Sequence, residues 1–300
     1  MNNLFFNIIA LIVGVFFLST SAIFVKLIHA PVDIIAFYRL FFSWIIMLPI
    51  LIINKNLRFE LKSLTLKQYF LGSVSGLLLA AHYIFWFESL NYTSVSSSTA
   101  LVTLQPIFAV ILGYVLFKDK TNYIGIFGII ISILGSGFIG WQDFQNNTLA
   151  LYGDFLALFA AFIITGYFFI GQFLRKDISV LSYSIIGYAS SSFFLLFYSI
   201  FKNSSFTNYS RETWYLLIFL ALFSTIFGQM LINWVLKWLS ATTVSVVILT
   251  EVIWATVLSI IILKEQISSN QVIGILAIIL GLVIYSYSAR IKLKSDNNMS

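Results

Sequence analysis

The chain has 300 residues, of which 60 % are hydrophobic and only 9 % are charged, whereas about a quarter of the residues in a soluble domain are charged. A soluble fold could not bury that much apolar surface, so the composition predicts a protein whose solvent is the lipid bilayer. The net charge of +6 does not indicate nucleic acid, because the basic residues form no continuous face with interleaved aromatic residues. The absence of cysteine excludes disulfides, thiol catalysis and cysteine-ligated metals.

Apolar segments of the length that a helix needs to cross a bilayer, roughly 20 residues, recur along the whole chain. No basic stretch precedes the first segment and no small-residue cleavage pattern follows it, so we expect a retained helix and not a signal peptide. The expected fold class is an all-α membrane protein with ten transmembrane helices. In chain order these are 7–28, 32–53, 68–90, 94–117, 122–141, 152–173, 178–201, 213–236, 240–263 and 270–289.

The distribution of lysine and arginine predicts the orientation of the chain. If the N-terminus is inside, twelve of the seventeen basic residues fall in cytoplasmic connections or in the tail, and three fall in external connections. Under the positive-inside rule both termini are then cytoplasmic, in a multi-pass protein of the plasma or bacterial inner membrane. The cytoplasmic set is Lys55, Arg58, Lys62, Lys67, Lys118, Lys120, Arg175, Lys176, Lys237, Arg290, Lys292 and Lys294, and the external set is Lys202, Arg211 and Lys264.

The two halves of the chain repeat one another without a gap. When residues 90–139 are shifted by 146 positions, glycines coincide and so does a turn of lysine followed by an acid. Aliphatic coincidences count for less, because isoleucine is abundant. The coinciding pairs include Leu90 with Leu236, Ser94 with Ser240, Lys118-Asp119 with Lys264-Glu265, Gly128 with Gly274, and Leu134-Gly135 with Leu280-Gly281.

Each half holds five predicted helices, an odd number, so the second half enters the membrane from the opposite side. We therefore expect two inverted five-helix repeats, residues 1–145 and 146–300, divided in the polar connection between Trp141 and Tyr152. Inverted repeats are typical of secondary transporters, whose substrate site lies near the bilayer midplane between the repeats.

Three segments resemble the drug/metabolite transporter superfamily, specifically its EamA-type ten-helix members. They are Ser19–Arg39, His82–Phe108 and Gly228–Glu265, and the resemblance runs through nearly the whole chain. It implies a cavity lined by the first, third, fourth, sixth, eighth and ninth helices, and export of small metabolites or drugs. Members of that family often have glutamate and proline in the ninth helix, whereas this chain has Glu251-Val252, so no proline is present to impose a kink there.

Glu251 is the leading candidate for a functional side chain. It lies near the middle of the ninth predicted helix, where a charged residue costs about 2.5–3.5 kcal/mol on insertion scales. A carboxylate at this depth can take up and release a proton or hold a cationic solute. The alternative is a structural hydrogen bond to a neighbouring helix.

Gln105, the repeat mate of Glu251, stands beside Pro106 in the fourth predicted helix. Proline removes the hydrogen bond to the carbonyl of Val102 and is expected to bend the helix. The freed carbonyl then needs a partner from the protein or from cavity water. The alternative is a kink that serves packing only.

Polar and aromatic side chains share helix faces at two further places. His82 and Trp86 are four residues apart in the third predicted helix, and Gln229 and Asn233 are four apart in the eighth. Lipid offers such faces no partner, so we expect them to point into the bundle and to contribute to substrate or proton binding. A satisfied interior histidine and a packed tryptophan are the alternatives.

Two basic residues lie within predicted helices. Arg39 is about 10 Å along the axis of the second helix, and we expect a structural ion pair with Asp33 or Glu88, or contact with an anionic solute. Lys26 and Glu88 lie near the external ends of their helices and can reach the interface by snorkelling. Arg39, Lys26 and Pro106 are therefore candidates for gating or structural roles.

The sequence as a whole predicts a transporter that moves a small solute by alternating access. It has no P-loop, so energy must come from a solute or ion gradient. A passive facilitator or channel is the alternative, whereas an intramembrane enzyme would need a catalytic constellation that the sequence lacks. We expect no cofactor, metal site or nucleic acid. The expected partners are a small solute, lipid and protons, and the expected assembly is a monomer or homodimer.

Overall fold

The structure, a computed structural model of the chain, describes residues 4–119, 121–144, 148–264, 266 and 268–297. All regular secondary structure in these ranges is helical, which confirms the predicted all-α class. The segments η1 and η2 are π-helical. The elements are α1 (Leu4–Leu27), α2 (Val32–Ile53), α3 (Lys55–Ser63), α4 (Leu66–Ser89), α5 (Val95–Val102), α6 (Gln105–Phe117), α7 (Tyr123–Phe144), α8 (Thr148–Leu174), α9 (Val180–Phe201), α10 (Arg211–Phe219), η1 (Leu220–Gln229), α11 (Met230–Val235), α12 (Ala241–Ile248), α13 (Glu251–Leu258), η2 (Ser259–Leu263) and α14 (Ser269–Asn297).

The helices correspond to the predicted spans. Among the described residues, eight helical stretches are long and apolar enough to cross a membrane. The fifth and tenth predicted spans correspond to α7 and α14, whose apolar stretches, Tyr123–Phe138 and Val272–Ser288, are shorter. Together these elements account for all ten predicted spans. The short helix α3 lies in a connection for which the sequence predicts no helix.

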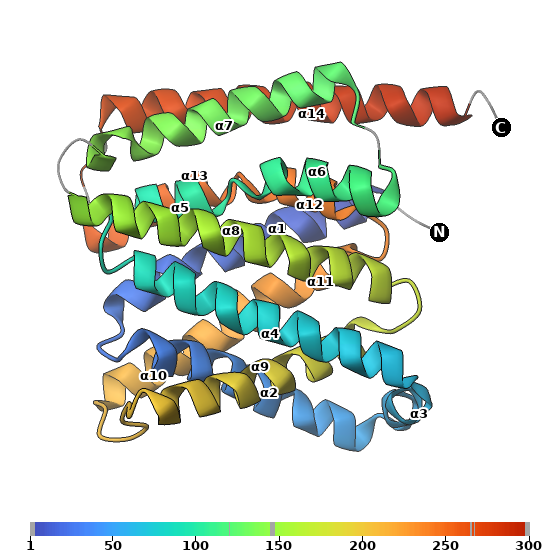
Figure 1. Cartoon of the computed structure of the whole chain (residues 1–300), viewed down its shortest axis with the longest axis vertical. Coiled ribbons are helices and arrows are strands. Elements are labelled where there is room, and N and C mark those ends of the chain that lie inside the picture. Colours follow the sequence, from blue (N-terminus) through green and yellow to red (C-terminus); the bar gives the residue numbers. More distant parts are fainter. Residues whose placement is uncertain (1–3, 120, 145–147, 265, 267, 298–300) are drawn as a thin grey trace.

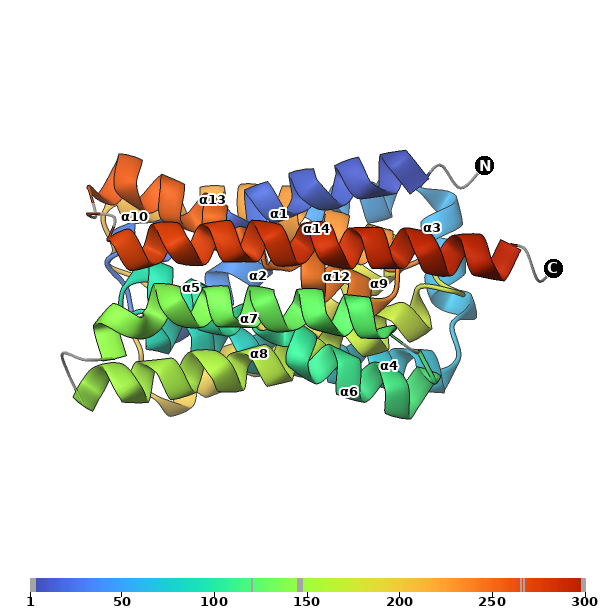
Figure 2. The same ribbon diagram turned by 90° about the horizontal axis from the view of Figure 1, so that it is seen from above.

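The helices run roughly parallel or antiparallel in one bundle, seen from the side in Figure 1 and from above in Figure 2. α7 and α14 lie side by side along one edge, while α2 and α9 lie at the opposite edge (Figure 1). The start of α1 and the end of α14 are at the end of the bundle that carries α3 (Figure 1). This placement agrees with an even number of spans between the two ends of the chain.

The contact between α7 and α14 reveals the symmetry of the repeats. A Cβ added to Gly128 would lie 2.6 Å from the carbonyl oxygen of Gly281, and one added to Gly135 would lie 2.6 Å from that of Gly274. Gly274 is the repeat mate of Gly128, and Gly281 is the repeat mate of Gly135, so the two contacts are equivalent under the 146-residue shift. The backbones can approach this closely only because the residues are glycines. A pseudo-two-fold axis therefore passes between these two helices.

Matching backbone features recur at the same offset. Lys118 ends α6 and Lys264 ends η2, each in the left-handed conformation, with φ angles of 56° and 59°. Ser94 and Ser240 cap the starts of α5 and α12, and each hydroxyl accepts a hydrogen bond from a backbone N–H three residues further on. The repeat is thus present in local geometry as well as in sequence.

The fourth and ninth spans are both broken near the middle. The fourth is interrupted between α5 and α6, where Pro106 lies in the first turn of α6. The ninth is interrupted between α12 and α13, just before Glu251, although the residue equivalent to Pro106 is Val252. The absence of a proline therefore does not keep the ninth span straight.

The eighth span departs from the regular α-helix that the sequence predicts. Residues Leu220–Gln229 form η1, between α10 and α11. Its buried side chains include Thr225 and Gln229, and Thr225 bonds to Arg39 of α2. π-Helical turns within α-helices are frequent at functional sites, so the residues that contact this segment are candidates for the functional site.

Candidate functional site

Arg39 on α2 is 0 % exposed and lies among three other elements. Its Nε donates to Thr225 Oγ1 of η1 at 2.9 Å, and its Nη1 donates to Ser21 Oγ of α1. Its guanidinium carbon lies 4.0 Å from the centre of the Tyr83 ring of α4, which is a cation–π contact. Its Nη2 has no hydrogen-bond partner in the part of the chain that the structure describes.

The predicted ion pair of Arg39 with Asp33 or Glu88 is wrong. Asp33 lies 3.9 Å from Lys202 Nζ, close to the end of α9, and this is the only ion pair within 4.0 Å among the described residues. Glu88 accepts a hydrogen bond from the Tyr92 hydroxyl at 3.3 Å, and its charge raises the pKa of Tyr92. The physical reason is depth, since Asp33 lies six residues, about 9 Å, nearer the end of the bundle than Arg39.

Glu251 begins α13, directly after the break in the ninth span, and is 3 % exposed. It interacts electrostatically with Arg39 and with Tyr83. The carboxylate and the guanidinium nevertheless do not reach ion-pair distance. The two opposite charges therefore lie near each other in the interior without neutralising each other by direct contact.

Gln105 and Pro106 occupy the matching break in the fourth span. Pro106 has no N–H to offer to the carbonyl of Val102, and Gln105 Nε2 donates to that carbonyl oxygen at 3.3 Å. Gln105 Oε1 is buried and has no hydrogen-bond partner within the described ranges. The glutamine thus satisfies the freed backbone group and still presents an acceptor.

His82 and Trp86 both lie inside the bundle, on the face of α4 that also carries Tyr83. The His82 and Trp86 rings are stacked, with centroids 5.6 Å apart and planes inclined by 28°. His82 Nδ1 lies 3.0 Å from the carbonyl oxygen of Ala160 on α8. The indole Nε1 of Trp86 has no partner among the described residues. His82 is thus held by a neighbouring helix, whereas Trp86 keeps a free donor.

Gln229 and Asn233 belong to a different network, nearer the end of the bundle that carries α3. Gln229 Nε2 donates to Asn233 Oδ1 at 3.4 Å, and the Tyr167 hydroxyl donates to the same oxygen at 2.8 Å. Asn233 Nδ2 donates to Ser184 Oγ at 3.4 Å, and Arg175 Nε donates to the Asn233 carbonyl oxygen at 3.0 Å. This network joins η1 and α11 to α8 and α9.

Lys26 lies outside both groups, at the end of α1. Its Nζ donates to the carbonyl oxygens of Leu90, at 2.5 Å, and Thr93, at 3.4 Å, in the turn between α4 and α5. Its mate at the 146-residue offset is Gln172, whose Oε1 accepts from the N–H of Ala241, just after the turn between α11 and α12, at 2.6 Å. Each repeat therefore ties the end of its first span to the turn before its own broken span.

The structure places Arg39 near Glu251 and His82, whereas Gln229 and Asn233 bond to each other and to α8 and α9. It also adds residues that the sequence analysis did not identify, because uncharged hydroxyl side chains are common in the spans and no spacing marks them. Depth in the membrane could have identified Tyr83, because Tyr83 lies about as far from the end of its span as Arg39 lies from the end of its own span. The added residues are Ser21, Tyr83, Tyr167, Tyr188 and Thr225.

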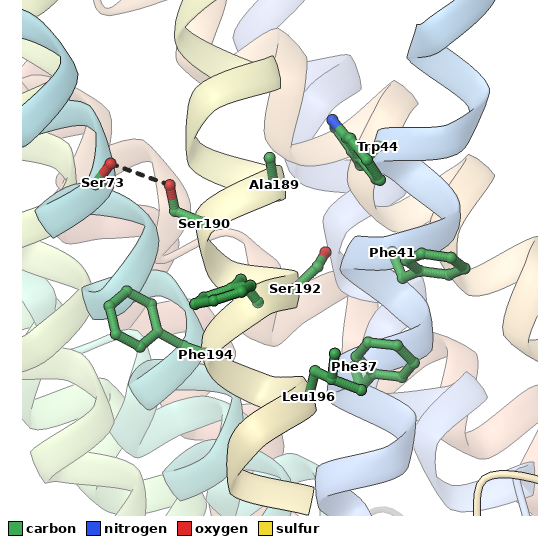
Figure 3. Close-up of a pocket in the computed structure, with 10 residues that line it drawn as sticks. Phe37, Phe41, Trp44, Ser73, Ala189, Ser190, Ser192, Phe194 and Leu196 are labelled. Atoms are coloured by element: carbon green, nitrogen blue, oxygen red, sulfur yellow. Dashed lines mark hydrogen bonds between the residues drawn. The ribbon is translucent and has the colours of Figure 1, made fainter.

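A separate apolar groove with a volume of about 520 Å³ lies between α2, α4 and α9 (Figure 3). No charged side chain lines it, and Phe193 on its rim is 61 % exposed. Ser190 Oγ of α9 donates to Ser73 Oγ of α4 at 3.2 Å, and both residues line the groove (Figure 3). The groove therefore does not coincide with the charged residues. Its lining is Phe37, Phe41, Trp44, Ser73, Ala189, Ser190, Ser192, Phe193, Phe194 and Leu196.

The site thus contains two buried side chains of opposite charge type, Arg39 and Glu251, and several aromatic rings between the inverted repeats. Among the described residues, no group of three or more His, Cys, Asp or Glu side chains could hold a metal ion. Multiple apolar spans with such an interior define a multi-pass membrane protein of the transporter class.

The chain belongs to the EamA-like transporter family. The family model matches residues 5–141 and again 151–287, and the two matches begin and end 146 positions apart. A protein named "Uncharacterized transporter" from Clostridium kluyveri is 28 % identical over 212 residues, which cover 68 % of this chain and 67 % of that protein. "Uncharacterized transporter YoaV" from Bacillus subtilis is 25 % identical over 255 residues, covering 83 % and 85 % of the two chains.

A solved structure supports the fold independently. It is described as "Crystal structure of protein", is 13 % identical to this chain, and has a TM-score of 0.74 over 94 % of this chain and 96 % of that one. At this identity the likeness extends to the fold alone. The family match makes the protein a membrane transporter of the EamA-like family, and the solved structure agrees with its helical architecture.

Proposed function

We propose that this transporter exports a small solute from the cytoplasm by alternating access, and that Arg39 and Glu251 mark its central site. The observation that carries the proposal is the placement of two opposite charges, both buried, near each other but not in contact. Burying charge in a bilayer is costly, and a purely structural role would favour direct pairing. In this proposal the solute lies between the two side chains when the site opens.

Alternating access is supported by the symmetry of the repeats. The broken spans α5–α6 and α12–α13 are equivalent, and each provides a point at which half of a span can move. Lys26 and Gln172 hold equivalent turns at opposite ends of the bundle. Exchanging the conformations of two such repeats would open one end while closing the other.

Proton coupling is assigned to Glu251. An ionised carboxylate in the interior is stable only when it is paired or hydrated, so the approach or departure of a solute changes the cost of its charge. The groups that interact with it are Arg39 and Tyr83, and His82 directly precedes Tyr83 on α4. Proton entry through Glu251 would accompany solute exit, so that an inward proton gradient drives export.

The orientation follows from the distribution of basic residues. We assign both termini, α3 and the network around Asn233 to the cytoplasmic side, and the turn held by Lys26 to the external side. The membrane is the plasma or bacterial inner membrane. The two inverted repeats are taken as residues 1–145 and 146–300, and the functional unit as a monomer or homodimer.

The test is transport by purified protein in liposomes whose lumen is acidic. The molecules whose cytoplasmic side faces outward then experience an outward proton gradient, which should drive solute into the lumen. The liposomes receive a mixture of small metabolites, and mass spectrometry identifies what accumulates inside. We expect at least one solute to accumulate against its gradient and to leak out when an uncoupler is added. Equilibration without accumulation for every transported solute would instead favour a passive facilitator or channel.

A further inference from the structure

Four polar side chains around the proposed central site keep an atom without a partner in the described part of the chain. These atoms are Arg39 Nη2, the hydroxyls of Tyr83 and Tyr188, and Trp86 Nε1. The Tyr83 hydroxyl lies near Arg39 and the Tyr188 hydroxyl near Ser184, but neither contact has the geometry of a hydrogen bond. Each of the four residues is at most 2 % exposed. Leaving a buried polar group unsatisfied costs about 1–3 kcal/mol, so four such groups in one region need an explanation.

The four groups belong to one region of the interior. The Arg39 guanidinium lies over the Tyr83 ring, and the Tyr83 and Trp86 ring centroids are 6.5 Å apart. Arg39 and Tyr83 both interact electrostatically with Tyr188, which comes from α9. The four residues therefore come from α2, α4 and α9 and are neighbours in the interior. Glu251 approaches the same region from α13.

The chemistry of these groups favours an anionic ligand. Guanidinium and indole nitrogens can only donate, and tyrosine hydroxyls donate readily to a charged oxygen. A carboxylate offers two acceptor oxygens, which the free arginine nitrogen and the hydroxyls can share. The nearby Glu251 charge disfavours a dianion such as a phosphate monoester, and the aromatic rings suit an apolar group beside the anion.

Resting on the proposed function, we propose that these four donors form a carboxylate-binding subsite, and that the transported solute carries a carboxylate. Arg39 supplies the charge, while Tyr83, Tyr188 and Trp86 fix the orientation of the carboxylate. A solute amine, where one is present, would lie toward Glu251. Arg39 is thereby assigned to solute recognition.

The test uses the same liposomes with a defined mixture of matched compounds: carboxylic acids, their primary amides, the corresponding amines, and phosphate monoesters of similar size. We expect the carboxylates to be transported and their amides not to be. Tyr83→Phe and Tyr188→Phe should each raise the apparent KM for the transported carboxylate about tenfold, because a hydrogen bond to a charged group is lost. Arg39→Gln should abolish carboxylate transport, and Arg39→Lys should retain a part of it.

The matched control is Tyr183→Phe, which also removes a buried hydroxyl, but one that is already bonded to Ser75 Oγ at 2.5 Å. It should leave the KM unchanged. Selective transport of the amides, amines or phosphates would overturn the inference, and so would unchanged carboxylate KM values in both folded phenylalanine variants at 83 and 188. Wild-type protein that transports no compound of any class would instead overturn the proposed function.

Discussion

The two repeats build the same broken span from different residues. In the first, the N–H of Leu104 donates to the Leu101 carbonyl at 3.1 Å; in the second, the equivalent N–H of Thr250 donates to the Val247 carbonyl at 3.0 Å. Pro106 accompanies the first break, whereas the hydroxyl of Thr250 bonds to the Val247 carbonyl at 2.8 Å in the second. The break is thus maintained by short-range backbone bonds, and a proline is one of two ways to stabilise it.

The charges, in contrast, do not follow the symmetry. Glu251 has Gln105 as its mate, and α9, the counterpart of α2 in the second repeat, has no charged residue to match Arg39. Each repeat therefore contributes one charge to the central site, the cation from the first and the carboxylate from the second. Under the proposed function, the shared backbone would serve movement, and the unshared side chains would bind the solute and the proton. This division tells us where substitutions should affect the fold, the transport rate or the coupling.

The largest expected effect tests the inverted orientation of the repeats, because labelling of a cysteine from outside the cell either occurs or does not. The chain has no cysteine, so a single introduced cysteine is a clean probe. Thr207→Cys, in the exposed connection before α10, should react in intact cells with a membrane-impermeant maleimide, whereas Ser63→Cys at the end of α3 should not. Reaction of the cysteine at 63 in sealed cells would contradict the topology and the external position of the Trp141–Tyr152 connection.

Replacing the unshared carboxylate by its repeat mate should remove coupling. Glu251→Gln keeps the size and hydrogen-bonding groups but cannot titrate, so the variant should insert normally and exchange solute across the membrane. It should lose accumulation driven by a pH gradient. The measurement compares uphill uptake with solute exchange in the same liposomes. Full, pH-dependent uphill transport by this variant would reduce Glu251 to an interhelical hydrogen bond.

The two breaks can be compared by exchanging the residues that differ. Pro106→Ala lets the N–H at 106 bond to the Val102 carbonyl and favours a continuous helix, so transport should slow by up to about tenfold, which equals 1.4 kcal/mol of barrier. The reciprocal Val252→Pro should have a smaller effect, because the backbone there is already interrupted. Initial rates at equal protein levels measure both. A Pro106→Ala rate equal to that of the wild type would make this proline a packing feature.

The sequence predicts the spans and the repeat well because both depend on periodic, local features. Apolar length identifies a span, and glycines such as Gly128 and Gly135 identify close helix contacts without knowledge of the partner. The surroundings of Arg39 could not be predicted, because its partners Thr225 and Tyr83 are uncharged and lie far away in the chain. The sequence instead suggests the acidic residues Asp33 and Glu88 as partners, but they lie nearer the end of the bundle than Arg39. The π-helical form of η1 likewise has no sequence marker comparable to a proline.

The smallest expected effect separates the hydroxyls that support the fold from those left free for a solute. The Tyr183 hydroxyl bonds to Ser75 Oγ at 2.5 Å and lies 3.4 Å from the Tyr167 carbonyl oxygen, joining α9 to α4 and α8. Hydrogen bonds between membrane helices contribute about 0.6 kcal/mol on average. Tyr183→Phe should therefore lower the free energy of unfolding by about that amount.

Tyr83→Phe should leave the free energy of unfolding unchanged or raise it slightly, because the hydroxyl that it removes makes no contact with the geometry of a hydrogen bond to the described residues. Both variants keep the ring, so packing is matched and the comparison isolates the hydroxyl. Reversible unfolding in mixed detergent, followed by tryptophan fluorescence, measures the two values on one scale. A larger loss of stability for Tyr83→Phe than for Tyr183→Phe would mean that the Tyr83 hydroxyl supports the bundle, and would remove it from the proposed carboxylate subsite.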